Sequence, residues 1–210
     1  MQLLWVVAML GVVTAECPAS LLQTISTCYA PYLRFFGVSA GKNLPVPSSW
    51  QVPREQMYQK DGRNAIFPVC SNTWTLADCL RKNLPVPREC YEALGLSAAD
   101  ASNYQTDVMS MEFQCTTGID ALYNNFDCYR SAAEHYQAQF EQCTADYGKN
   151  VRVDVCKAMN GLMDCRSSIY GKACGDQLKA LTCGISRVAL NLVDPTCDAD
   201  GKLNKCPAPN

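Results

Sequence analysis

The chain contains fourteen cysteines, whose thiols can stay free, bind a metal or form disulfides. The number is even, no two are adjacent, and none falls within the first sixteen residues. Such a set forms free thiols, metal sites or disulfides, and the redox compartment decides which. The cysteines are Cys17, Cys28, Cys70, Cys79, Cys90, Cys115, Cys128, Cys143, Cys156, Cys165, Cys174, Cys183, Cys197 and Cys206.

The spacing of these cysteines does not suit a metal. Structural zinc sites favour Cys-x-x-Cys pairs, often completed by histidine. This chain contains no Cys-x-x-Cys, and its only histidine is His135. We therefore expect neither a metal nor another cofactor. We expect seven disulfides that use all fourteen cysteines, with a connectivity that spacing alone does not reveal.

The N-terminus has the features of a secretory leader. Leu3 to Val13 is an uncharged apolar run, shorter than the roughly 20 residues that span a bilayer. Val13-Thr14-Ala15 then provides the compact residues of a signal-peptidase site. We predict a signal peptide over residues 1–15 and a secreted, extracellular product without a transmembrane anchor. The alternative is a buried N-terminal helix.

Composition narrows the classes of partner. The chain is 48% hydrophobic and nearly balanced in charge, with 18 Lys and Arg against 20 Asp and Glu. A nucleic-acid-binding protein normally shows a basic surplus or stripe, so we expect no nucleic acid partner. The length after the predicted leader suits one compact unit. We therefore predict a single cysteine-rich helical domain over residues 16–210.

Apolar periodicity predicts helices. One seam steps by three and four residues from Ile119 to Tyr147, which predicts one long helix ended by Gly148. A second seam runs from Cys174 to Leu192 and ends before Pro195. The first seam consists of Ile119, Leu122, Phe126, Tyr129, Ala133, Tyr136, Phe140, Cys143 and Tyr147.

Four further segments fit helices less regularly. Apolar faces cover 21–36, where Pro31 should kink or split the helix, and also 66–80, 97–115 and 155–171. Ser97 should cap the third of these helices. The proline-rich segments 43–53 and 83–88 are predicted loops, and Trp74 is expected in the core. The fold class that follows is all-α: a disulfide-stapled bundle of five to seven helices with little or no β-sheet.

A nine-residue cysteine step constrains the disulfides. The pattern Cys-x8-Cys occurs five times, for instance at Cys156, Cys165 and Cys174. Nine residues turn an α-helix by about 900°, which places the two side chains on opposite faces. Such cysteines cannot bond to each other along one continuous helix. We therefore expect that each of them reaches a neighbouring helix or that the helix breaks between the two cysteines.

The segments 67–79, 111–115, 125–129 and 172–175, together with Cys183, share a pattern of cysteine spacing and neighbouring residues. In this pattern the chain resembles a family of small secreted cysteine-rich proteins of nematodes that carry the chondroitin proteoglycan 4 domain. The resemblance implies an extracellular core protein that bears glycosaminoglycan chains. This chain departs from that pattern, because it contains neither the Ser-Gly dipeptide used for xylose attachment nor an Asn-x-Ser/Thr sequon.

Catalytic motifs are missing from the sequence. There is no His-Glu-x-x-His, no Gly-x-Ser-x-Gly and no phosphate-binding loop. His135 lies one step off the long seam, which is typical of a boundary or surface histidine. The segment 198–201 resembles part of a calcium loop, but Thr196 and Pro207 occupy two of its essential ligand positions. We predict no enzymatic activity and no catalytic residue.

Three function classes remain open from the sequence. The first is a non-enzymatic structural or interaction protein of the extracellular space, in a matrix, an eggshell or a secretion, whose partner is an extracellular protein or glycan. The second is a carrier of a small hydrophobic ligand, a lipid or sterol, in a cavity that the aromatic seam could line. The third is a glycan or ester hydrolase that uses a pair of carboxylates.

Overall fold

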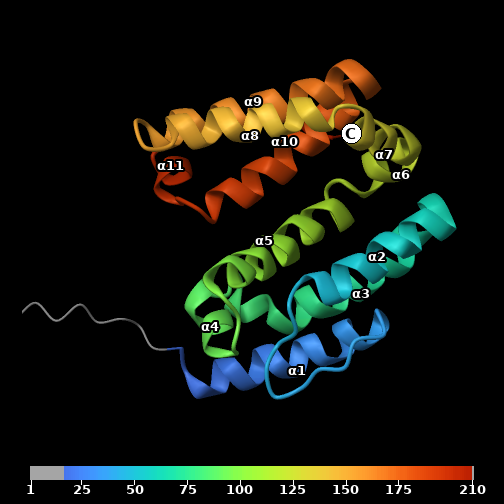
Figure 1. The fold of residues 1–210 in the computed structure, drawn as a ribbon, viewed down its shortest axis with the longest axis vertical. Coiled ribbons are helices and arrows are strands. Elements are labelled where there is room, and N and C mark those ends of the chain that lie inside the picture. The colour runs from blue at the N-terminus through green and yellow to red at the C-terminus, as the bar shows by residue number, and fades with distance from the viewer. Residues whose placement is uncertain (1–16, 210) are drawn as a thin grey trace, which may run out of the picture.

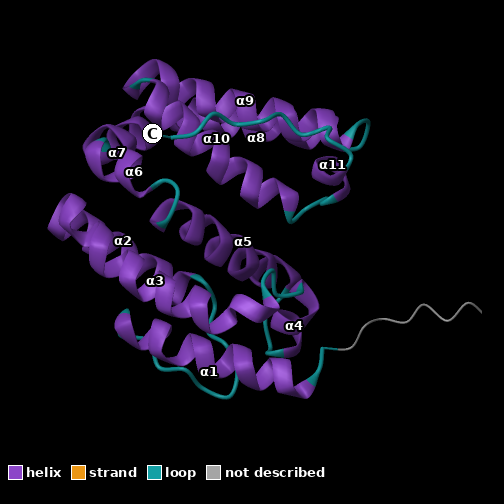
Figure 2. Cartoon of the chain, turned by 180° about the vertical axis from the view of Figure 1, so that it is seen from behind, coloured by secondary structure: helices purple, strands orange, loops and turns teal. Residues whose placement is uncertain are grey.

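The computed structural model describes residues 17–209, and within that range the chain folds into helices with no strand (Figures 1 and 2). The predicted all-α, disulfide-stapled fold is confirmed. Seven helices have fourteen or more residues: α1, α2, α3, α5, α8, α9 and α10. The predicted signal peptide, residues 1–15, lies outside the described residues.

Between residues 17 and 209, eleven α-helices and two short 3-10 helices follow one another. None of the helices described between residues 17 and 209 is long and apolar enough to cross a membrane. In order, they are α1 (Ala19–Phe35), α2 (Ser48–Asp61), η1 (Gly62–Ala65), α3 (Ile66–Leu80), η2 (Arg81–Asn83), α4 (Arg88–Ala93), α5 (Ala98–Cys115), α6 (Ile119–Asn124), α7 (Phe126–His135), α8 (Gln137–Asn150), α9 (Val155–Cys174), α10 (Asp176–Asn191) and α11 (Thr196–Ala199).

The helices form two halves (Figure 1). In the first half, residues 17–115, α3 packs between α1 and α5. In the second half, residues 119–209, α9 packs between α8 and α10. The halves meet where α5 packs against α10. A side chain at Gly184 would clash with the ring of Phe113, so the glycine allows this close approach of the two helices.

Two clusters of buried apolar side chains stabilise the fold. The larger cluster includes Tyr29 and Trp50 of the first half and Leu181 of the second. The smaller cluster, which includes Met159 and Met163, lies within the second half. Because the larger cluster contains side chains from both halves, burial of apolar surface holds them together. That a single domain covers residues 16–210 stays a prediction.

Every cysteine is bonded, and no two cysteines nine residues apart are bonded to each other, as the spacing predicted. Five disulfides join two helices, whereas Cys17 and Cys206 lie outside the helices and bond to α4 and α10. Three disulfides lie within the first half and four within the second. Of these seven bonds among residues 17–209, none crosses between the halves. The pairs are Cys17–Cys90, Cys28–Cys79, Cys70–Cys115, Cys128–Cys174, Cys143–Cys165, Cys156–Cys197 and Cys183–Cys206.

The prediction of one long helix over 119–147 is wrong. The chain leaves helical geometry at Asn125 (φ −117°, ψ 19°) and at Tyr136 (φ −107°, ψ 21°), which gives α6, α7 and α8. The bends have a packing cause: Phe126 belongs to the larger core cluster, whereas Cys143 belongs to the smaller one. One straight helix could not present a single seam to both clusters. Gly148 does not end the last segment, since α8 continues to Asn150.

Two other predictions about residues are corrected. The segment 43–53 is not wholly a loop, because α2 begins at Ser48 and contains Pro53 in its second turn. Pro53 is the sixth residue of α2, so its missing N–H leaves the Ser49 carbonyl without the usual i→i−4 partner, and the helix continues without that bond. Trp74 is 42% exposed, whereas Trp50 is the buried tryptophan. The buried stripe of α3 passes beside Trp74, whose indole Nε1 donates to the Cys115 carbonyl at 3.0 Å.

Two other predictions about helix ends are confirmed. The Ser97 hydroxyl caps α5 by accepting a hydrogen bond from the backbone N–H of Asp100 at 3.1 Å. The helix that carries most of the second apolar seam, α10, ends at Asn191, ahead of Pro195. Pro31 lies inside α1 without splitting it.

Candidate functional site

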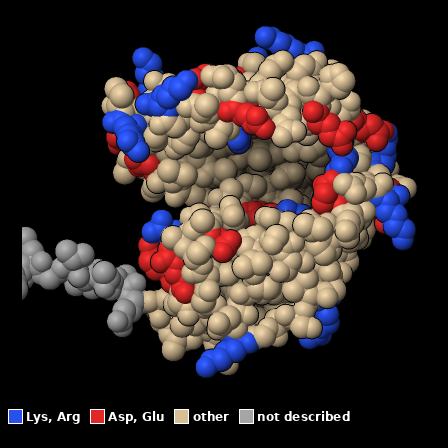
Figure 3. Space-filling view, viewed as in Figure 1, with Lys and Arg blue, Asp and Glu red and all other residues tan. Residues whose placement is uncertain are grey.

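The surface is hollowed between the two halves (Figure 3). A pocket of about 390 Å³ lies between α2 and α5 of the first half and α6 and α7 of the second. We refer to it as the interhalf pocket. The twelve residues that line it are Gln51, Arg54, Glu55, Tyr58, Asp107, Ser110, Met111, Gln114, Leu122, Phe126, Tyr129 and Arg130.

A largely buried ion pair lies at the first-half wall of this pocket. Arg54 of α2 donates two hydrogen bonds to the Asp107 carboxylate of α5, at 2.6 and 3.1 Å. Both side chains are only 13% exposed, and the guanidinium lies 5.0 Å from the centre of the Trp50 ring. Burial disfavours the charge on Arg54, but the Asp107 carboxylate outweighs it and raises the pKa of Arg54. The pair joins α2 to α5 by a bidentate, charge-assisted contact.

A second ion pair crosses from one half to the other. Arg130 of α7 donates to both carboxylate oxygens of Glu55 of α2, one of them at 3.0 Å. These hydrogen bonds from Arg130 lower the pKa of Glu55. Outside the pocket, Arg63 and Asp127 form a further pair between the halves. The four charged residues of the lining therefore form two ion pairs, and their charges sum to zero.

The rest of the lining is apolar or neutral. The rings of Tyr58 and Phe126 lie 5.6 Å apart between their centres. Met111 and Leu122 add aliphatic surface. Burial raises the pKa of Tyr58 to about 12, so its phenol is neutral at physiological pH. This part of the pocket suits contact with an uncharged surface of a bound molecule.

One polar group of the lining stands out. Ser110 of α5 is 8% exposed, and its hydroxyl has no hydrogen-bond partner among the described residues. Buried hydroxyls are normally hydrogen-bonded, because leaving one unpaired costs about 1–3 kcal/mol. The neighbouring Gln114 side chain does not relieve it, since its amide donates to the Ser110 backbone carbonyl at 3.2 Å instead. The oxygen is enclosed by neighbouring atoms, so a hydrogen bond to a molecule in the pocket requires rotation of the Ser110 side chain.

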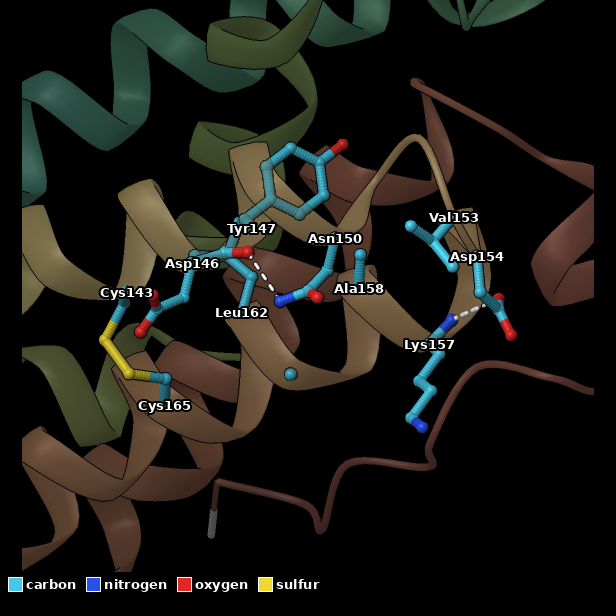
Figure 4. Close-up of a pocket in the computed structure, with 11 residues that line it drawn as sticks. Cys143, Asp146, Tyr147, Asn150, Val153, Asp154, Lys157, Ala158, Leu162 and Cys165 are labelled. Carbon is cyan, nitrogen blue, oxygen red and sulfur yellow. Dashed lines mark hydrogen bonds between the residues drawn. A yellow bond between two sulfur atoms is a disulfide. The ribbon is translucent and has the colours of Figure 1, made fainter.

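A second cavity, the α8–α9 groove, has a volume of about 350 Å³ (Figure 4). The Cys143–Cys165 disulfide closes one end, and the 86% exposed Val153 lies at the other. Asn150 donates from its side chain to the Asp146 carbonyl at 2.8 Å, so this polar group is already satisfied within α8. A Cβ added at Gly161 would meet no atom within 4 Å, which marks the groove as open to solvent.

The structure does not bring together the residues that the sequence analysis considered for catalysis, calcium binding or a ligand cavity. His135 is exposed at the end of α7. Asp198 pairs with Arg187, and Asp200 pairs with Lys202. Across residues 17–209, no group of three or more His, Cys, Asp or Glu side chains is placed to hold a metal ion. The aromatic seam does not line one cavity: Tyr129 borders the interhalf pocket, whereas Tyr147 borders the groove.

Sequence reasoning missed the interhalf pocket because it treated the start of α2 as a loop. The signal was nevertheless present, since Trp50, Arg54 and Tyr58 are spaced by four residues and therefore share one helix face. The partner Asp107 lies 53 residues further along the chain from Arg54. No local pattern connects these two residues.

Comparison with protein-family models, with curated proteins and with solved structures finds no match to this chain. The resemblance to the chondroitin proteoglycan 4 domain therefore stays a prediction.

Proposed function

We propose that this chain is a secreted, non-enzymatic interaction protein of the extracellular space, of the chondroitin-proteoglycan-4-like type but without a glycosaminoglycan attachment site. The observation that carries the proposal is that all fourteen cysteines are bonded, in seven disulfides that each link separate segments of the chain. Disulfides of this density persist in oxidising compartments and are rare in the cytosol. They support an extracellular setting.

The electrostatics of the interhalf pocket support binding rather than catalysis. An efficient general base has a pKa near the working pH, which usually requires a raised carboxylate pKa. Glu55 has a lowered pKa because Arg130 donates to it, so it is a weaker base than a free glutamate. Asp107 is held in two hydrogen bonds by Arg54. Both carboxylates therefore serve to join helices.

Secretion is tested by expressing the full chain in eukaryotic cells and recovering it from the medium. We expect a mature N-terminus at Glu16 and an intact mass below the reduced mass by fourteen hydrogens, two for each disulfide. Alkylation without reduction should label no cysteine. Recovery of the chain only from the cytosol, or labelling of several cysteines, would overturn this part of the proposal.

The interaction role is tested with the same secreted protein. The folded chain, incubated with extracellular matrix and crosslinked, should be retained by a protein or glycan partner. The reduced and alkylated chain is the matched control and should be lost in the wash. Treatment with chondroitinase should leave the mass unchanged, and a fall in mass would contradict the absence of an attached chain. Equal retention of the folded and reduced chains would count against a specific interaction.

A second candidate function is carriage of a small hydrophobic ligand. The interhalf pocket favours it, because its volume of about 390 Å³ falls within the roughly 300–1,000 Å³ typical of small-molecule sites. Native mass spectrometry of the secreted protein separates the candidates. A stoichiometric small-molecule adduct supports carriage, whereas a bare protein mass counts against it.

A further inference from the structure

The charged residues of the interhalf pocket limit which molecules can enter it. Two arginines and two carboxylates line the pocket, and each is bonded to one of the others. A charged ligand would meet no free counter-charge within the described lining and would have to break one of these pairs. Burying an unpaired charge is far more costly than burying a neutral group. The lining therefore selects for an uncharged molecule.

The apolar residues define where the body of such a molecule would lie. Phe126 and Tyr58 present rings to the pocket, and Met111 contributes a flexible thioether. Methionine adapts to ligands of different shape, and aromatic rings provide large apolar contacts. This surface suits a molecule with an aromatic or aliphatic body.

The Ser110 hydroxyl defines where a polar group of the molecule would lie. It is buried and has no hydrogen-bond partner between residues 17 and 209. A hydroxyl both donates and accepts a hydrogen bond, and rotation about one side-chain bond redirects it. A ligand with a single N–H, hydroxyl or carbonyl group could satisfy it.

We propose that the interhalf pocket binds a small, neutral, amphipathic molecule whose apolar body packs on Phe126, Met111 and Leu122 and whose one polar group hydrogen-bonds to Ser110. This proposal names the site and the ligand class of the second candidate function, and it rests on that function. It distinguishes the interhalf pocket from the α8–α9 groove, whose polar Asn150 side chain is already bonded.

Two fluorescent probes that differ by one charged group test the ligand class. N-phenyl-1-naphthylamine is neutral and carries one N–H, and 8-anilinonaphthalene-1-sulfonate adds a sulfonate to the same skeleton. The neutral probe should bind the full secreted chain with one site. The anionic probe should bind at least about tenfold more weakly, because its charge would remain unpaired. Failure of the neutral probe to bind, or equal affinity for both probes, would overturn the proposal.

Variants test the location. Gln114→Trp should abolish binding of the neutral probe by filling the pocket, whereas Gln139→Trp, on the exposed face of α8, should leave binding unchanged. Ser110→Ala should weaken binding roughly three- to tenfold through loss of one hydrogen bond. Since that variant removes only an unpaired hydroxyl, it should fold as well as the parent. Unchanged affinity in Ser110→Ala would overturn the assigned polar contact.

The competing cavity provides the last control. Gly161→Trp fills the α8–α9 groove and should not affect the neutral probe. If this variant abolishes binding while Gln114→Trp does not, the assigned site is wrong. A small-molecule adduct that persists in Gln114→Trp would likewise overturn the site but leave the carrier function standing. If the secreted protein carries no small-molecule adduct and binds no neutral probe, both the assigned site and the carrier function are wrong.

Discussion

Ser110 and the Arg54–Asp107 pair are polar groups that the packing of helices places largely out of water. They differ in one respect. The ion pair satisfies itself with two hydrogen bonds, while the Ser110 hydroxyl has no partner within the described part of the chain. Replacing Ser110 by an apolar residue should therefore raise the free energy of unfolding, whereas removing one partner of the ion pair should lower it.

Replacing Ser110 by alanine should stabilise the protein. The change removes a buried, unpaired hydroxyl and adds a better helix former, so the free energy of unfolding should rise by about 1–2 kcal/mol. Ser71→Ala, at an exposed position of α3, is the control for helix propensity alone. Urea denaturation with intact disulfides measures both. If Ser110→Ala gains no more than Ser71→Ala, the hydroxyl has a partner in solution.

Breaking the Arg54–Asp107 pair should be costly. Arg54→Met leaves the Asp107 carboxylate unpaired and should lower the free energy of unfolding by about 3–5 kcal/mol. The double variant Arg54→Met with Asp107→Leu should recover much of that loss. The matched control is Arg81→Met, which removes a pair with Asp78 that is about three-quarters exposed and should cost less than about 1 kcal/mol. A similar loss in both single variants would contradict the burial of the first pair.

At the scale of the element, α9 explains the nine-residue cysteine step. Its three cysteines bond to three different elements: Cys156 to α11, Cys165 to α8 and Cys174 to α7. Because successive cysteines point to opposite faces of the helix, one helix can be bonded to neighbours on both sides. The same helix also borders the groove, where Gly161 leaves a gap.

Gly161→Ala should stabilise α9. A methyl group there meets no atom within 4 Å, and alanine is favoured over glycine in a helix interior by about 1 kcal/mol. Gly175→Ala is the contrasting change, since Gly175 has φ +89° and an alanine there should cost about 1–3 kcal/mol. Thermal unfolding followed by circular dichroism compares the two. A loss of stability in Gly161→Ala would mean that the groove is closed in solution.

We predict that the protein unfolds at high pH, because burial of tyrosines in α1, α2, α4 and α5 disfavours their ionised form. Burial raises the pKa of Tyr29, Tyr32, Tyr91 and Tyr104, and it raises the pKa of Tyr58 to about 12. These phenols are more acidic in the unfolded chain, near 10. Their contribution to stability is therefore complete below about pH 10 and is lost as the pH rises through the folded values, for Tyr58 between about 10 and 12.

Tyrosine absorbance at 295 nm and circular dichroism, recorded together against pH, check this prediction. Ionisation of the buried tyrosines should coincide with loss of helix above pH 10. Complete ionisation near pH 10 with the helices intact would contradict the burial of these side chains.

At the scale of the whole molecule, the disulfides and the apolar core divide the chain differently. The disulfides form two separate sets, in residues 17–115 and 128–206. The larger core cluster and two ion pairs join the halves without a covalent link other than the chain itself. The interhalf pocket lies where the covalent framework is weakest.

A protease site inserted between Thr116 and Thr117 tests the division of the disulfides. After cleavage, the two fragments should separate on a denaturing gel without reductant, because among the seven disulfides described none joins the halves. The matched control is a site inserted at Arg152, between α8 and α9. Its fragments should stay together until reduced, since Cys143–Cys165 and Cys128–Cys174 both span the cut. Comigration of the Thr116 fragments without reductant would show that a disulfide crosses.

The helical class, the cap at Ser97 and the rule that cysteines nine residues apart do not bond to each other could all be predicted from the sequence. These features depend on local geometry, namely the 3.6-residue turn and the hydrogen bonds at a helix end. The pairing of the cysteines depends on the packing of helices, since partners lie 22 to 73 residues apart in the chain. Packing also determines that the seam over 119–147 bends, that Trp50 rather than Trp74 is buried, and that Arg54 meets Asp107. Each of these depends on which helix faces pack together, and periodicity in one segment does not specify the segment that it will face.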